Sequence, residues 1–179
     1  FYGFALFMGP VEAELGLTRA QSSVAYSLAL LLEGLMAYPV GRWIDRGHER
    51  AVMTAGSLVL ALCLVLHSQI QTLAAFYLVW AGLGVGLAAT LYPPAFAVLT
   101  RRFPHDFRRA IITLTFLGGL ASTLFIPLTD ALIRQAGWRQ ALLVLAALHL
   151  LVCAPLHAVQ LRHAPSPVTR AALAQAWRL

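Results

Sequence analysis

Long apolar segments separated by short polar turns make up most of the chain. Segments of about 20 apolar residues are long enough to cross a hydrocarbon core of roughly 30 Å. Such segments lie near 22–41, 51–67, 73–99, 110–132 and 139–160. Residues 1–11 are apolar too, but they are too few to cross and have neither a starting Met nor a basic segment. We interpret them as the outer part of a truncated first helix, not as a signal peptide. The pattern predicts an all-α integral membrane protein with six transmembrane helices.

The composition agrees with this prediction. Hydrophobic residues make up 60% of the chain and charged residues only 11%, whereas soluble domains carry about 25% charged residues. So few charges cannot cover a water-facing surface. We therefore expect the helices to contact the lipid bilayer.

The placement of arginine predicts the orientation in the membrane. When alternate connections between spans are grouped, ten arginines fall on one side of the membrane and three on the other. The ten are Arg42, Arg46, Arg50, Arg101, Arg102, Arg108, Arg109, Arg162, Arg170 and Arg178. The three are Arg19, Arg134 and Arg139. Cytoplasmic connections accumulate positive residues. We therefore expect the 42–50 loop and the carboxy terminus to be cytoplasmic and the helices to cross the inner (plasma) membrane. The arginines lack interleaved aromatic residues, so we expect no nucleic-acid partner.

Two connections contain clear helix boundaries. Thr18 followed by Gln21 predicts a capping box at the start of the second helix. After the sixth helix, prolines at 165 and 167 break the chain, and Thr169 predicts the start of an amphipathic helix at the cytoplasmic surface. We therefore divide the chain into an amino-terminal transmembrane half, residues 1–162, and an interdomain linker, residues 163–179.

Small residues recur on two of the predicted helices. Gly34, Ala37 and Gly41 form a stripe at helical spacing, which predicts close packing against a neighbouring helix. The run Gly82, Gly84 and Gly86 precedes a Tyr-Pro-Pro sequence and predicts tight packing followed by a proline kink. The same run resembles a nucleotide loop only superficially, because no strand precedes it.

An internal comparison predicts a repeat. A shift of 88 positions aligns Pro39 with Pro127 and Arg46 with Arg134. Each aligned set closes a long apolar segment with a proline and then a charged turn. The shift corresponds to three helices, and because three is odd the two units have opposite orientations. This is the pattern expected of an inverted three-plus-three repeat.

The segment 41–50 resembles a signature of the major facilitator superfamily of secondary transporters. The family motif has the form G-x-x-x-D-R-x-G-x-R, which Gly41, Asp45, Arg46 and Arg50 match. The sequence departs from the motif inside the turn, where Gly47 comes one position early and Glu49 replaces a common basic residue.

Other segments resemble bacterial members related to monocarboxylate and oxalate/formate carriers. These segments are 2–4, 9–15, 101–103, 108–109 and 137–139. The resemblance implies that the chain is the amino-terminal six-helix half of a twelve-helix transporter, with a carboxy-terminal half as its missing partner. It implies alternating-access transport of a small solute, a small organic anion in this subgroup, with symport among the possible modes. The alternative is a membrane-embedded enzyme or a signalling or scaffold subunit without transport.

The resemblance also implies a gating role for the 41–50 motif. Asp45 can accept hydrogen bonds from the end of a facing helix, and Arg46 and Arg50 can pair with carboxylates or carbonyls there. Contacts that form in only one global state bias the equilibrium between states. The alternative is a positive-inside loop without a gating role.

Of all side chains, that of Glu33 costs the most free energy to place in the membrane, because this carboxyl group lies near the middle of the second predicted span. A carboxyl group there can bind and release a proton as a cavity opens and closes, which makes Glu33 a candidate proton-coupling site. Tyr26, two turns earlier on the same face, is a candidate for lining the same cavity. The alternative is a neutral Glu33 that is hydrogen-bonded to a neighbouring helix.

The remaining polar residues indicate structural roles. Asp130 and Arg134 are four residues apart, which predicts an ordinary ion pair on the fifth span. His149, Cys153 and His157 share a helix face, but the two histidines are about 12 Å apart along the axis, too far for one metal ion. We therefore expect no metal, no cofactor and no enzyme chemistry. We also expect no disulfide, because the two cysteines lie within spans.

Overall fold

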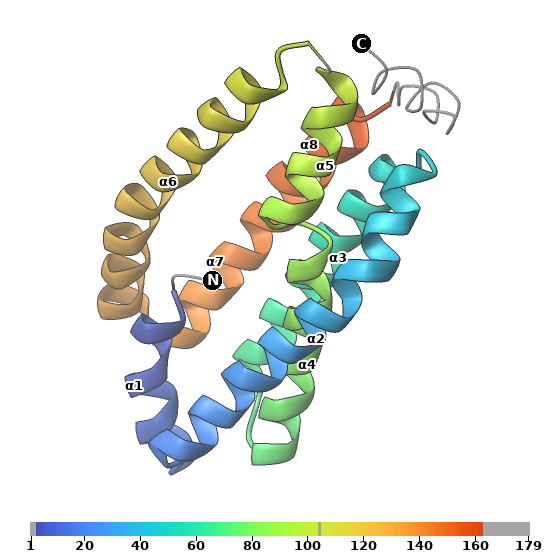
Figure 1. The fold of residues 1–179 in the computed structure, drawn as a ribbon. Helices are drawn as coiled ribbons and strands as arrows, with labels where there is room; N and C mark the ends of the chain where they lie inside the picture. Colours follow the sequence, from blue (N-terminus) through green and yellow to red (C-terminus); the bar gives the residue numbers. More distant parts are fainter. Residues whose placement is uncertain (1–2, 104, 163–179) are drawn as a thin grey trace.

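The fold, seen in a computed structural model, consists of helices joined by short turns. The structure describes residues 3–103 and 105–162, so the predicted amphipathic helix after Thr169 lies outside the described residues. The helices, in chain order, are α1 (Phe4–Leu15), α2 (Arg19–Asp45), α3 (Glu49–Ser68), α4 (Leu73–Ala88), α5 (Tyr92–Arg102), α6 (Phe107–Ala136), α7 (Trp138–Leu148), the π-helical segment η1 (His149–Cys153) and α8 (Ala154–Gln160). They run roughly side by side along the molecule (Figure 1).

Five helical rods are long and apolar enough to cross a membrane. They are Arg19–Asp45, Glu49–Ser68, Leu73–Arg102, Phe107–Ala136 and Trp138–Gln160. Each contains one of the five spans predicted from the sequence and extends it by a few residues, so those predictions are confirmed. α1 has 12 residues and is about 18 Å long, shorter than a full crossing.

Local sequence fixes the ends of these rods. The Thr18 side chain accepts a hydrogen bond from the Gln21 amide, and the Gln21 side chain bonds the Thr18 amide in return, which confirms the predicted capping box. Three glycines lie at helix ends and have positive φ angles. They are Gly16 after α1 (64°), Gly47 after α2 (87°) and Gly137 between α6 and α7 (84°). A side chain would be strained in this left-handed region, so glycine permits these abrupt turns.

Two rods are interrupted near prolines. The rod Leu73–Arg102 breaks between α4 and α5, and α5 begins with prolines in its first turn, as the Tyr-Pro-Pro sequence predicts. The last rod contains the π-helical turn η1 directly before Pro155 in α8. Proline has no amide hydrogen for the bond to the preceding turn, which accounts for a local change in helix winding there.

The glycines of α4 allow the closest helix packing in the described residues. A Cβ atom on Gly84 would lie 2.3 Å from the Ala29 carbonyl oxygen of α2, and one on Gly86 would lie 2.8 Å from Leu60 of α3. The predicted tight packing of this run is confirmed. In contrast, a Cβ on Gly34 or Gly41 would meet nothing within 4 Å. No described helix therefore packs closely against their stripe.

The structure contains the repeat that the sequence predicts. α2 begins at Arg19 and α6 at Phe107, 88 positions later, and the aligned prolines Pro39 and Pro127 both lie inside these long helices. Each helix is followed by a turn with a left-handed glycine and then by another rod. The fold is therefore the all-α, six-helix arrangement expected from the sequence, built from two three-helix units.

The helix α6 stands apart from the rest of the bundle (Figure 1). Of the residues of α6, all of which the structure describes, only Thr129 is buried. Large apolar side chains such as Phe116 and Leu124 are exposed along it, as are Leu31, Leu35 and other residues of α2. Both α2 and α6 thus present apolar surface that the described helices leave uncovered.

We predict that Gly84→Ala destabilises the protein by about 1–3 kcal/mol, because the added methyl group would overlap the α2 backbone. Gly119→Ala on α6 is the matched control, since a methyl group there would meet nothing within 4 Å, and it should be neutral or slightly stabilising. Unfolding of both variants in mixed detergent micelles measures the difference. Equal stabilities would contradict the packing described for α4.

Candidate functional site

The 41–50 motif joins the end of α2 to the start of α3. Asp45 is the last residue of α2, Arg46 is its C-cap, and Gly47 makes the left-handed turn into α3. The side chains of Asp45, Arg46 and Arg50 are exposed. Within residues 3–103 and 105–162 none of the three forms an ion pair, so they face away from the bundle.

Glu49, by contrast, is completely buried, and the sequence pattern did not reveal its importance. It begins α3, and its carboxylate lies 2.6 Å from a guanidinium nitrogen of Arg102 and 3.7 Å from Arg101. The start of a helix favours a negative charge. Arg102 also donates to the Gln160 carbonyl at the end of α8. Arg101 and Arg102 therefore do more than mark orientation, because they neutralise a carboxylate that has left water.

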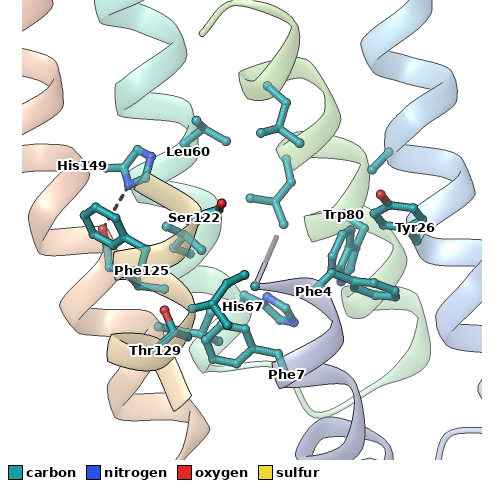
Figure 2. A pocket seen from close by; sticks show the side chains of 18 of the residues that line it. Phe4, Phe7, Tyr26, Leu60, His67, Trp80, Ser122, Phe125, Thr129 and His149 are labelled. Atoms are coloured by element: carbon teal, nitrogen blue, oxygen red, sulfur yellow. Dashed lines mark hydrogen bonds between the residues drawn. The ribbon is translucent and has the colours of Figure 1, made fainter. Parts of the chain in front are cut away.

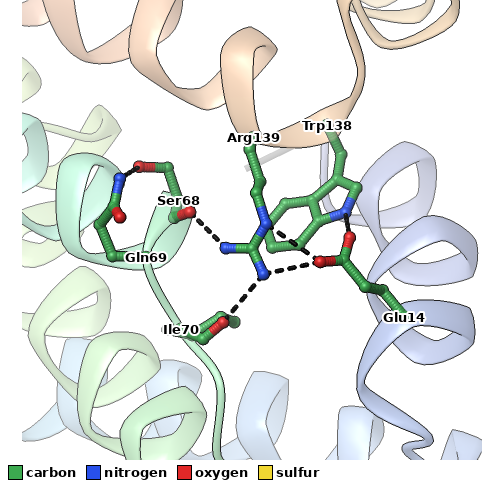
Figure 3. Close-up of polar contacts among 6 residues, drawn as sticks. All are labelled: Glu14, Ser68, Gln69, Ile70, Trp138 and Arg139. Atoms are coloured by element: carbon green, nitrogen blue, oxygen red, sulfur yellow. Dashed lines mark hydrogen bonds and ion pairs between the residues drawn. The ribbon is translucent and has the colours of Figure 1, made fainter.

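A second polar cluster lies at the opposite end of the rods, where α1 and α3 end and α7 begins. Figure 3 shows its contacts. Arg139 in the first turn of α7 donates to Glu14 of α1 over 2.8 Å, to the carbonyl of Ser68, the last residue of α3, and to the Ile70 carbonyl that follows it. The Trp138 ring N–H donates to the other Glu14 oxygen over 2.6 Å. The Arg139 guanidinium also lies over the Trp138 ring, 4.3 Å from its centre. This cluster ties together α1, α7 and the α3–α4 connection.

A cavity of about 240 Å³ lies between these two ends (Figure 2). It is bounded by α1, α2, α3, α4, α6, α7 and the start of η1, and its walls are mostly apolar. The polar side chains that line it are Tyr26, His67, Ser122, Thr129 and His149. No Arg, Lys, Asp or Glu of the described chain lines the cavity.

The structure separates the two candidate residues of α2. Tyr26 lines the cavity, stacks on Phe4 with ring centres 4.5 Å apart and meets Trp80 edge-on at 6.1 Å. Glu33, two turns further along α2, is half-buried and is not a lining residue. Its Oε2 atom is buried and has no hydrogen-bond partner in the described part of the chain.

The histidines of the last rod have separate partners. His149 Nδ1 lies 3.1 Å from the Leu145 carbonyl one turn earlier, and His157 Nδ1 lies 2.9 Å from the Ser57 hydroxyl of α3. His157 therefore connects α8 with α3, while His149 places the rest of its ring at the cavity.

Asp130 and Arg134 form the ion pair that their spacing suggests, with 2.6 Å between nitrogen and oxygen. Their side chains are 37% and 77% exposed. An exposed pair of this kind contributes only about 0.3–0.5 kcal/mol. The geometry is that of a local contact on α6.

Comparison with known proteins identifies the family. Residues 1–178 match the family described as the Major Facilitator Superfamily. The chain belongs to the major facilitator superfamily. It is therefore part of a multi-pass membrane protein, and members of this superfamily are carriers, not enzymes.

Three relatives illustrate the similarity. The uncharacterized MFS-type transporter YcxA of Bacillus subtilis (strain 168) is 26% identical over 90% of this chain and 40% of its own length. Monocarboxylate transporter 11 of Mus musculus is 33% identical over 87% of this chain and 36% of its own length. Monocarboxylate transporter 13 of Bos taurus is 39% identical over 66% of this chain and 28% of its own length. The chain thus spans well under half the length of these superfamily relatives.

We predict that Glu49→Gln costs about 3–5 kcal/mol of stability, because the largely buried Arg102 guanidinium loses the carboxylate with which it pairs. Asp130→Asn is the matched control, and it should cost no more than about 0.5 kcal/mol because that pair is exposed. Detergent-denaturation midpoints of the two variants test the contrast. A Glu49→Gln variant as stable as the control would show that the buried pair does not stabilise the fold.

Proposed function

We propose that this chain is the amino-terminal six-helix half of a secondary active transporter, which moves a small solute across the membrane by alternating access. The observation that carries the proposal is the superfamily match over nearly the whole chain. The exposed motif residues Asp45, Arg46 and Arg50 add support, since a gate needs accessible charged groups and these three form no ion pair within the described residues.

The partner in this proposal is a second six-helix half. The relatives are more than twice as long as the matched segment. The open stripe of Gly34 and Gly41, together with the apolar surfaces of α2 and α6, provides a face that a second half can cover. Small residues allow helix backbones to approach closely within lipid. The stripe that packs against nothing in the described chain thus has a role in the complete protein.

The division of the chain completes the proposed domain organisation. Residues 1–162 would form the transmembrane half, and residues 163–179 would form the interdomain linker. The 42–50 loop and this linker would lie in the cytoplasm, as the distribution of arginine favours.

The proposed solute is a small organic anion of the monocarboxylate class, in a bacterial carrier subgroup. Two of the relatives are named monocarboxylate transporters. The cavity lining offers hydroxyl and imidazole groups and, within the described residues, no positive side chain. An anion that travels together with a proton carries no net charge through such surroundings, so proton symport fits better than transport of the bare anion.

Glu33 is the proposed proton carrier. Its half-buried side chain has one oxygen without a hydrogen-bond partner in the described chain. A carboxyl group with few polar neighbours favours its neutral form in lipid, and water entering an opened path favours ionisation. Alternation between the two surroundings would couple proton binding to the change of state.

We predict that Asp45→Asn changes the ratio of inward-facing to outward-facing molecules, because an amide loses the charge that can hold a facing helix end. Cysteine-accessibility labelling of the complete protein in vesicles measures the ratio. Asp106→Asn, an exposed carboxylate before α6, is the matched control and should leave labelling unchanged. An unaltered pattern in Asp45→Asn would remove the gating role.

We predict that Glu33→Gln abolishes the acceleration of uptake by an inward-directed proton gradient, while solute exchange without a gradient continues. Uptake of labelled lactate, a short-chain monocarboxylate, into proteoliposomes of the complete protein is the measurement. Asp130→Asn on α6 is the control and should keep the full response. If Glu33→Gln retains full proton dependence, Glu33 is a structural residue.

A further inference from the structure

Each end of the bundle contains an arginine that joins three helices. The Arg139 clamp consists of Arg139 at the start of α7, Glu14 near the end of α1, the Ser68 carbonyl at the end of α3 and the Ile70 carbonyl just after it. The Arg102 clamp consists of Arg102 at the end of α5, Glu49 at the start of α3 and the Gln160 carbonyl at the end of α8. In both clamps, one guanidinium group binds a carboxylate and the end of a further helix.

The charged members of the two clamps occupy equivalent positions in the repeat. Glu14 and Arg102 are 88 positions apart, the same shift that aligns the prolines of α2 and α6. Glu49 and Arg139 are 90 positions apart, the same shift that aligns the two left-handed glycines Gly47 and Gly137. Acid and base have therefore changed places between the two units, while each position keeps a charged residue.

One of the two carbonyls that Arg139 binds follows the same relation. Ile70 follows α3 and Gln160 ends α8, and they are also 90 positions apart. In the Arg139 clamp, Arg139 at the start of the last rod of the second unit binds the Ile70 carbonyl. In the Arg102 clamp, Arg102 at the end of the first rod of that unit binds the Gln160 carbonyl. Either position can thus supply the guanidinium group, provided that the other supplies the carboxylate.

We propose that the two clamps are charge-reversed equivalents, and that their residues position the two three-helix units so that the six helices move as one rigid body. Each clamp crosses from one unit to the other, since α1 and α3 belong to the first unit and α5, α7 and α8 to the second. α1 buries only Phe7 and Val11, so its outer end relies on the Arg139 clamp for a fixed position. The rigid-body part of the proposal rests on the proposed alternating-access function, whereas the equivalence of the clamps does not.

The two clamps differ in burial, which sets the expected size of the effects. In the Arg102 clamp the side chains of Glu49 and Arg102 are 0% and 20% exposed. In the Arg139 clamp the side chains of Glu14 and Arg139 are 48% and 33% exposed. Water screens the second pair more strongly. Disruption of the Arg102 clamp should therefore have the larger effect.

Charge reversal and exchange in the complete protein test the equivalence. Glu49→Arg or Arg102→Glu alone places like charges together and should lower the thermal unfolding midpoint by more than about 5 °C. Glu14→Arg or Arg139→Glu alone should lower it by about 2–4 °C. Each double exchange rebuilds the arrangement of the opposite clamp and should recover at least half of the loss. The double change Asp130→Arg with Arg134→Asp, in an exposed pair within one helix, is the control and should shift the midpoint by less than about 2 °C.

Double exchanges that lose as much as the two single reversals added together would overturn the equivalence. This readout needs no solute. If proteoliposomes of the complete protein move no labelled lactate, that result counts against the proposed monocarboxylate function only, and the unfolding midpoints still decide the clamps.

Cross-linking tests the rigid-body role separately. Glu14→Cys and Arg139→Cys are combined in a background that carries Cys63→Ser and Cys153→Ser, and the new pair is joined by a short bifunctional thiol reagent. If the units move together, the cross-link should leave the ratio of inward-facing to outward-facing labelling unchanged. A shift of that ratio toward one state after cross-linking would show that the Arg139 clamp opens during the cycle, and would overturn the rigid-body role.

Discussion

The close contact between α4 and its two neighbours is the interaction on which the rest of the structure depends. In lipid, helices gain little from burying apolar side chains, so association depends on how closely backbones can approach. Gly84 lies directly against the Ala29 backbone, and Gly86 accommodates Leu60. This contact holds α2, α3 and α4 together across the boundary between the two three-helix units. The cavity wall formed by Tyr26 and Trp80 and the positions of the rod ends follow from it.

Much of the fold could be predicted from the sequence because its main signals are local. The length of an apolar run determines a span, and Thr18 with Gln21 determines a helix start without reference to distant residues. The repeat was also visible, because Pro39 and Pro127 keep their positions within equivalent helices. The stripe containing Gly34 shows the limit of such signals. Helical spacing indicates that a face is suited to close packing, but it does not identify the partner helix.

The candidate site was less predictable, because its contacts join residues that are distant in the sequence. Glu49 looked like a deviation within a turn motif until the structure placed it against Arg102, 53 residues later. Burial of a carboxylate depends on which rod ends meet, and the pattern within one helix does not contain that information. Tyr26 and Glu33 illustrate the same point. Their shared helix face was evident, yet only Tyr26 reaches the cavity, because the neighbouring helices decide which turn of α2 faces it.

The π-helical turn of the last rod has a consequence for the geometry of the end of that rod. A π-turn accommodates one residue more than an α-turn, so it rotates all that follows by roughly 100° relative to an uninterrupted α-helix. Because His149–Cys153 precedes α8, this extra residue sets the angular phase with which the Gln160 carbonyl meets Arg102. Deleting one residue from this turn would keep the rod long enough for the bilayer but would point its final carbonyls in a different direction.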